Sequence, residues 1–195
     1  MRLKKMDTFQ NKYRIKTARY EGHDYSQNGY YFVTICVKDK QEYFGEVVNG
    51  EMKLSEVGKS VNEEWAKTEK IRKNVKLDKF VVMLNHLHGI VIIEDSRDAL
   101  NASPKIGRRT QCVSTDENCK NKFGPQTNNL ASIIRGFKSA STKIIRNTLP
   151  YFQWQSRFYD RVIRNETELG KIQEYIERNP KFWDEDKNKV ENIFY

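Results

Sequence analysis

Four side chains have the types and spacing to hold a metal ion beside a nucleophile. His86 and His88 are separated by one residue in the most apolar stretch of the chain. On a strand the two imidazoles would share a face, because residues i and i+2 point to the same side, whereas on a helix they would diverge by about 200°. The β-branched and aromatic runs on both sides favour a strand, and Leu84-Asn85 is short enough for a hairpin turn.

Tyr175 and Asn179 are the second pair. They stand four residues apart in a segment with helical periodicity, so they lie one turn apart on one face. If that face packs against the histidine strand, the two histidines and Asn179 offer two imidazole nitrogens and an amide oxygen to one metal ion. Tyr175 would then stand beside that ion. The alternative is that the histidines are satisfied core residues of a hairpin, and their spacing alone leaves both interpretations open.

The charge balance indicates a polyanionic partner. The 195 residues carry a net charge of +9, and nucleic acid is the usual partner of so basic a chain. The three cysteines have neither the number nor the spacing of a disulfide framework or a zinc knuckle, and no apolar run is long enough to span a membrane. We therefore expect a cytoplasmic protein that does not enter a membrane. A basic protein without a nucleic-acid partner is the alternative.

One domain is the expected organisation. Residues 1–19 would form a basic N-terminal arm, residues 20–183 the domain, and residues 184–195 a C-terminal tail. Within the domain, residues 95–127 are rich in serine, asparagine, threonine, lysine and glycine, so we expect a flexible polar loop there. The arm and the loop both carry basic residues that suit contacts with phosphates.

Hydrophobic patterning predicts an antiparallel sheet. In addition to the histidine strand, the expected strands cover residues 30–37, 43–48, 51–54, 75–83 and 152–164. Asn49-Gly50 has the sequence of a two-residue type I′ turn, which predicts a hairpin there.

Three helices accompany these strands. Ser55 is placed to cap the first helix, and Trp65 lies in the apolar stripe of that helix. Asn165, followed by Glu168 three residues later, has the pattern of a capping box and starts the last helix.

The middle helix, over residues 128–147, is expected to face DNA. One side is apolar, whereas the other carries basic and hydroxyl side chains without an acid, a composition suited to phosphate contacts. An ordinary solvated face is the alternative. The residues predicted to contact DNA, on this helix, the arm and the last strand, are Arg135, Lys138, Ser139, Lys143, Arg14, Arg19, Arg161 and Arg164.

Three blocks of the sequence resemble one family. They are Met83–Ile90, Ile133–Ser139 and Tyr175–Pro180. Together with further blocks between residues 20 and 183, they resemble the REP-associated tyrosine transposases. These are relatives of the single-tyrosine HUH transposases of the insertion-sequence-200-like family, in which HUH denotes histidine, a hydrophobic residue and histidine. The chain departs from the family pattern at Leu84, where a proline is common.

The resemblance implies a fold, an activity and a set of site residues. The fold is α+β and ferredoxin-like, an antiparallel sheet with helices packed on one face and the HUH motif on a central strand. The activity is metal-dependent cleavage and rejoining of single-stranded DNA near hairpins through a covalent 5′-phosphotyrosine, with Tyr175 as the nucleophile. His86, His88 and Asn179 would bind Mg²⁺ or Mn²⁺. The substrates would be REP-like palindromes, bound by a monomer or a homodimer.

Other assignments compete with these. Tyr159 is the rival nucleophile, although a strand-end tyrosine at a basic surface more often packs or stacks on a base. A protein that binds hairpin DNA or RNA without catalysis is the main alternative function. A replication initiator or relaxase is less favoured because the sequence has neither a helicase segment nor a second Tyr-x-x-x-Tyr pair. A zinc hydrolase is less favoured because Gly89 follows the histidine pair in place of the pattern that such enzymes continue.

Overall fold

The computed structural model describes residues 8–9, 12–13, 24–94 and 129–185. Most of the predicted basic arm, the whole predicted loop and nearly all of the predicted tail lie outside the described residues, as do Arg14 and Arg19. Within the arm only β1 (Thr8–Phe9) and β2 (Lys12–Tyr13) are described.

Four antiparallel strands form the central sheet, in the order β6-β7-β3-β8. They are β3 (Gly29–Cys36), β6 (Val75–Val82), β7 (His86–Ile93) and β8 (Tyr159–Ile163). One helix connects β3 to β6 and another connects β7 to β8, which gives the βαββαβ order of a ferredoxin-like fold. The predicted α+β class and antiparallel sheet are confirmed.

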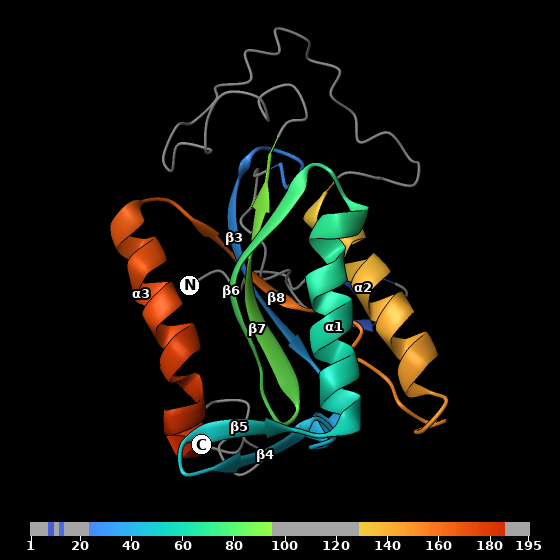
Figure 1. The fold of residues 1–195 in the computed structure, drawn as a ribbon. Coiled ribbons are helices and arrows are strands. Elements are labelled where there is room, and N and C mark those ends of the chain that lie inside the picture. Colours follow the sequence, from blue (N-terminus) through green and yellow to red (C-terminus); the bar gives the residue numbers. More distant parts are fainter. Residues whose placement is uncertain (1–7, 10–11, 14–23, 95–128, 186–195) are drawn as a thin grey trace, which may run out of the picture.

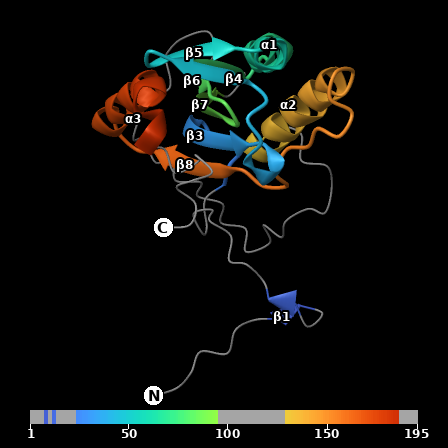
Figure 2. The same ribbon diagram turned by 90° about the horizontal axis from the view of Figure 1, so that it is seen from below.

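Helices cover both faces of this sheet. α1 (Glu56–Ile71) and α2 (Leu130–Ile145) lie on one face and α3 (Glu166–Arg178) lies on the other, as Figures 1 and 2 show. The prediction that all helices pack on one face is therefore wrong for α3. None of the helices in the described part of the chain has the length and apolar character needed to cross a membrane.

The physical reason for the two-sided arrangement is that β3 and β7 are apolar on both faces. The larger core lies under α1 and α2, where the predicted core residue Trp65 is fully buried and meets Phe137 edge to face at 4.9 Å. A smaller cluster on the other face joins Phe32 and Ile90 to Ile176 of α3. A sheet with two apolar faces must be covered on both sides.

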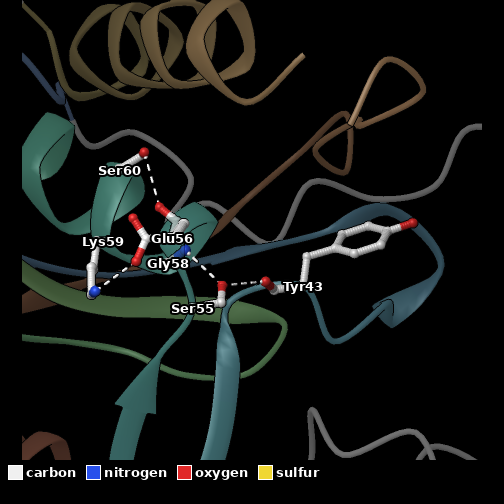
Figure 3. A network of polar contacts seen from close by, with 6 residues as sticks. All are labelled: Tyr43, Ser55, Glu56, Gly58, Lys59 and Ser60. Carbon is white, nitrogen blue, oxygen red and sulfur yellow. Dashed lines mark hydrogen bonds and ion pairs between the residues drawn. The ribbon is translucent and has the colours of Figure 1, made fainter. Parts of the chain in front are cut away.

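Ser55 caps α1 as predicted. Its hydroxyl oxygen accepts a hydrogen bond from the backbone N–H of Gly58 at 3.1 Å and donates one to the carbonyl oxygen of Tyr43 at 2.7 Å (Figure 3). In the same turn, Lys59 forms an ion pair with Glu56 at 2.7 Å. The cap therefore fixes the start of α1 to Tyr43, which lies just before the hairpin that precedes this helix.

That hairpin consists of β4 (Gly45–Val48) and β5 (Glu51–Leu54), which form a separate two-stranded sheet. Asn49 and Gly50 have φ angles of 54° and 76°, the left-handed pair that a type I′ turn requires, as predicted. The hairpin packs against the short 3₁₀ helix η2 (Asn179–Glu185), which follows α3.

The last strand is shorter than predicted. Only Tyr159–Ile163 pairs with β3 over its length, whereas Trp154 forms a single bridge with Val37. Phe152 and Trp154 enter the core under α1 and α2 instead, and their large apolar side chains gain more from that burial than from extending the strand. The predicted strand 152–164 is thus an irregular core segment followed by a five-residue strand.

Replacing Gly89 with alanine tests the packing beneath the histidine strand. A Cβ atom at this position would lie 2.9 Å from Cζ2 of Trp65 and 3.2 Å from Cβ of Phe80. We expect Gly89→Ala to lower the free energy of unfolding by about 1–3 kcal/mol, measured by denaturant titration. Gly170→Ala is the matched control, because this exposed helical glycine has nothing within 4 Å and alanine should leave stability unchanged or raise it. Equal effects of the two substitutions would contradict the account of Gly89.

Candidate active site

The register between β3 and β7 turns both histidines toward α3. Thr34 stands opposite His88 and Cys36 stands opposite His86, so these four side chains share one face of the sheet. Both histidines lie on β7, a central strand, and follow the short turn at Leu84-Asn85, as predicted.

The orientation of the His86 ring follows from the side chain of Asn85. The amide nitrogen of Asn85 donates to the carbonyl oxygen of Lys40 at 3.1 Å, so its oxygen Oδ1 faces His86. That oxygen lies 2.8 Å from Nδ1 of His86 and can only accept, so Nδ1 carries the proton. The lone pair of His86 is therefore on Nε2, which points toward His88.

His88 joins the strand pair to the helix. Its Nδ1 atom lies 2.8 Å from Oγ1 of Thr34, and its Nε2 atom lies 2.9 Å from Nε2 of His86. The hydroxyl oxygen of Tyr175 is 3.1 Å from the same Nε2 atom. Tyr175 thus lies beside the histidine pair, although 87 residues separate it from His88 in sequence.

An aromatic ring supports each imidazole. Phe32 of β3 stacks on His88 with the ring centroids 5.4 Å apart, and Trp183 of η2 stacks on His86 at 5.9 Å. Trp183 also packs with Met83 and Leu84, the residues that lead into the histidine turn. The sequence placed Phe32 only within the expected strand 30–37 and gave Trp183 no part in the site, because neither residue belongs to a motif.

Polar contacts hold α3 over the sheet at both edges. Toward β6, Gln173 donates to the carboxylate of Asp78 at 2.7 Å and Lys79 pairs with Glu177. Toward β8, the guanidinium of Arg161 and the carboxylate of Glu168 form an ion pair at 2.6 Å. With its apolar stripe buried between these anchors, α3 presents Tyr175 to the histidines in a fixed position.

Tyr175 is far more exposed than the histidines that it contacts. His86 and His88 expose 0% and 2% of their surface, whereas Tyr175 exposes 45%. Asn179, one turn beyond Tyr175, is buried at the end of α3. Tyr175 is thus the exposed side chain of this cluster.

The donor atoms fit a divalent metal ion. Two ligands at about 2.1 Å from one octahedral ion and at right angles lie about 3.0 Å apart, close to the 2.9 Å between the two Nε2 atoms. Hydrogen bonds at the opposite ring nitrogens, such as those with Thr34 and Asn85, are typical of metal-binding histidines. In the described part of the chain no three His, Cys, Asp or Glu side chains could hold an ion together, so an amide or water oxygen would have to complete the site.

The residues predicted to contact DNA lie on two different sides of the sheet. Arg161 and Arg164 are exposed on and beside β8, near the histidine face. Arg135, Ser139 and Lys143 are exposed on α2, which covers the opposite face (Figure 2). The predicted DNA contacts on α2 therefore lie on the other side of the sheet from Tyr175.

Lys138 of α2 has a structural contact that the sequence did not indicate. Its ammonium group donates to the carbonyl oxygens of Gln155 and Arg157 at 2.7 and 2.9 Å, and burial lowers its pKa to about 8. These bonds attach α2 to the irregular segment before β8. Lys138 is thus half-buried, and its ammonium group is bound to backbone carbonyl oxygens of the protein itself.

Tyr159, the rival nucleophile, lies on the histidine face at the start of β8. It exposes 48% of its surface, and its ring meets Phe32 edge to face with the centroids 6.3 Å apart. Tyr175, not Tyr159, makes the hydrogen bond to His88.

Comparisons with known proteins show similarity to one protein in sequence and to a solved transposase in fold. The chain is 35% identical over 178 residues to a Haemophilus influenzae protein described as uncharacterized, covering 90% of this chain and 93% of that protein. A solved REP-associated tyrosine transposase bound to a REP hairpin superposes with a TM-score of 0.56 and 18% identity, covering 89% of this chain and 77% of the transposase. No protein-family model matches the chain.

The pKa of Lys138 predicts how stability changes with pH. Between about pH 8 and pH 10 the folded protein has released this proton while the unfolded chain still holds it, so the free energy of unfolding gains a contribution as pH rises. We expect the difference in unfolding free energy between the wild type and Lys138→Met to grow in favour of the wild type over this range. Denaturant titrations at several pH values measure it. Ser139→Ala, an exposed neighbour with no titrating group, is the control, and a Lys138 difference that stays constant would contradict the prediction.

Proposed function

This chain belongs to one family with the Haemophilus influenzae protein and has the fold of a REP-associated tyrosine transposase, and from that premise we propose that it is a transposase-type enzyme. Its reaction would be the cleavage and rejoining of single-stranded DNA near hairpins. The observation that carries the proposal is the contact of the half-exposed Tyr175 with His88, which in turn contacts His86. A tyrosine hydroxyl held against a buried imidazole pair is what attack on a phosphodiester requires.

Tyr175 would act as the nucleophile. Its oxygen forms a bond to phosphorus while the bond from phosphorus to the 3′ oxygen breaks, which leaves a 5′-phosphotyrosine and a 3′-hydroxyl that takes up the phenol proton. Rejoining is the reverse attack by a 3′-hydroxyl. The energy of the phosphodiester is kept in the covalent link, so no nucleotide cofactor is consumed.

We propose that His86, His88 and Asn179 hold Mg²⁺ or Mn²⁺. Such an ion supplies positive charge that favours the phenolate form of Tyr175 and neutralises the non-bridging phosphate oxygens, and imidazole ligands favour Mn²⁺. The lone pair of His86 Nε2 is already directed into the site by Asn85. The Nε2 atom of His88 can bind an ion or share a hydrogen bond with Tyr175, so it serves one of these roles at a time.

The proposed substrate is DNA with a hairpin and an unpaired flank. The transposase with the same fold was solved with a REP hairpin, and the net charge of +9 supports a polyanionic substrate. Arg161 and Arg164 stand beside the candidate active site, where they would contact phosphates near the cleaved bond. The exposed basic residues of α2 would contact only DNA that extends around to the other face.

A covalent adduct tests the proposal. Incubation with end-labelled hairpin DNA and Mn²⁺ or Mg²⁺ should give a product that resists denaturation and migrates with the protein on a denaturing gel. Tyr175→Phe should abolish it, because the attacking oxygen is removed. Tyr159→Phe is the matched control and should retain it. An adduct that survives Tyr175→Phe but not Tyr159→Phe would reverse the assignment, and tight hairpin binding without any adduct would support the binding protein that lacks catalysis.

Metal affinity tests the support of His88 by Thr34. Thr34→Val keeps the shape but removes the oxygen that holds Nδ1, and loss of such a contact lowers metal affinity by about 10- to 100-fold. Mn²⁺ titration followed by electron paramagnetic resonance measures this without any turnover. Thr68→Val is the matched control, since Thr68 is also buried and bonded but lies on α1, across the sheet. An unchanged affinity in Thr34→Val would remove Thr34 from the proposed metal site.

A further inference from the structure

A groove runs along the outer edge of β8. It has a volume of about 830 Å³ and is bounded by β8, by the first turns of α3 and by Tyr25. Within the described residues β8 pairs with β3 on one side only, so this groove follows the open edge of the sheet. Its lining residues include Tyr159, Arg161, Arg164, Thr167, Glu168 and Lys171.

Tyr159 connects this groove to the candidate active site. Nearly half of its surface is exposed, and its ring meets Phe32 edge to face at 6.3 Å. Phe32 in turn contacts Tyr175 at 6.1 Å and stacks on His88. Tyr159 and Tyr175 thus both contact the ring of Phe32, which connects the groove to the candidate active site.

The charges around Tyr159 suit an anion. Arg161, Arg164 and Lys171 line the groove, against two carboxylates. One of these, Asp160, points to the opposite face of β8 and is buried. The other, Glu168, accepts from Nε and Nη2 of Arg161, which holds the guanidinium in the groove wall. The groove is thus lined by three basic side chains, one of them paired with Glu168, and by an exposed aromatic ring.

We propose that this groove binds one or two unpaired nucleotides adjacent to the cleaved phosphodiester, with a base stacked on Tyr159 and phosphates on Arg161, Arg164 and Lys171. The proposal rests on the proposed function and names a further binding site for its substrate. An exposed aromatic ring bordered by cations is the arrangement that holds single-stranded nucleic acid, and the volume suits one or two nucleotides. A peptide strand added to the β8 edge would need apolar pockets for alternate side chains, whereas charged and polar groups dominate these walls.

Base stacking gives a direct readout. The probe is a single-stranded DNA of about 12 nucleotides with one 2-aminopurine, moved along the strand in successive probes, and the protein is Tyr175→Phe, which keeps the groove but cannot form an adduct. Binding should quench the fluorescence most strongly at one position. Tyr159→Ala in this background should abolish that quench and weaken binding by about 5- to 150-fold, whereas Tyr159→Phe should retain both, because the ring is kept.

Two controls isolate the groove. Tyr151→Ala removes a tyrosine that is 94% exposed and lies outside the groove, so it should leave the quench unchanged. Arg161→Met should weaken binding of every probe and reduce its dependence on salt, while the quench at saturation is kept. An RNA strand of the same sequence shows whether the groove distinguishes the sugar.

The outcomes separate this proposal from the proposed function. A quench that persists in Tyr159→Ala overturns the stacking site, even when the wild type forms the covalent adduct. A quench that depends on Tyr159, in a protein whose wild type forms no adduct with any hairpin, supports the nucleotide groove and contradicts the transesterification. Binding of an extended peptide that competes with the DNA would overturn the choice of nucleic acid as the occupant.

Discussion

The register of β3 against β7 is the constraint on which the candidate active site depends. It sets Thr34 opposite His88, and the same pairing brings Phe32 over the His88 ring. Because side chains alternate along a strand, a slip of one residue would turn both histidines into the core under α1 and α2. The apolar residues on both faces, with Leu87 and Val91 on one side and Ile90 on the other, make such a slip costly. The packing that stabilises the sheet therefore also aims the imidazoles.

The two faces of the sheet have different tasks. One face carries the larger core, in which Trp65 fills the space that Gly89 leaves empty. The other face carries a smaller core and a polar cluster under α3, with the histidines buried and Tyr175 at the surface. Ion pairs and hydrogen bonds at both edges of α3 replace the apolar area that this thinner layer lacks. The larger core under α1 and α2 therefore supports β7 from behind, and the histidines and Tyr175 lie on the other face.

Local patterns predicted the elements well, and they predicted less of how the elements pack. The Asn49-Gly50 turn, the Ser55 cap and the shared face of His86 and His88 depend on neighbours in sequence, so they could be read from it. The position of α3 on the opposite face depends on which apolar surface each helix covers, and the sequence carries no local signal for that choice. For the same reason, the basic side of α2 looked like a DNA surface, although Lys138 is bound to carbonyl oxygens before β8. Trp183 was also missed as a support for His86, because its role comes from the fold of η2 against the turn at Leu84.

Because Trp183 stacks on His86 from the last described element of the chain, the candidate active site is completed late in translation. The histidine strand β7 ends at Ile93, 82 residues before Tyr175, an interval of about 4 to 16 s at ordinary rates of translation. During that interval a growing chain can pair β3, β6 and β7, but it has neither the proposed nucleophile nor the indole that supports His86. A chain that stops before α3 would therefore contain both histidines but neither Tyr175 nor Trp183. The proposed chemistry begins only once the last helix of the domain has been made.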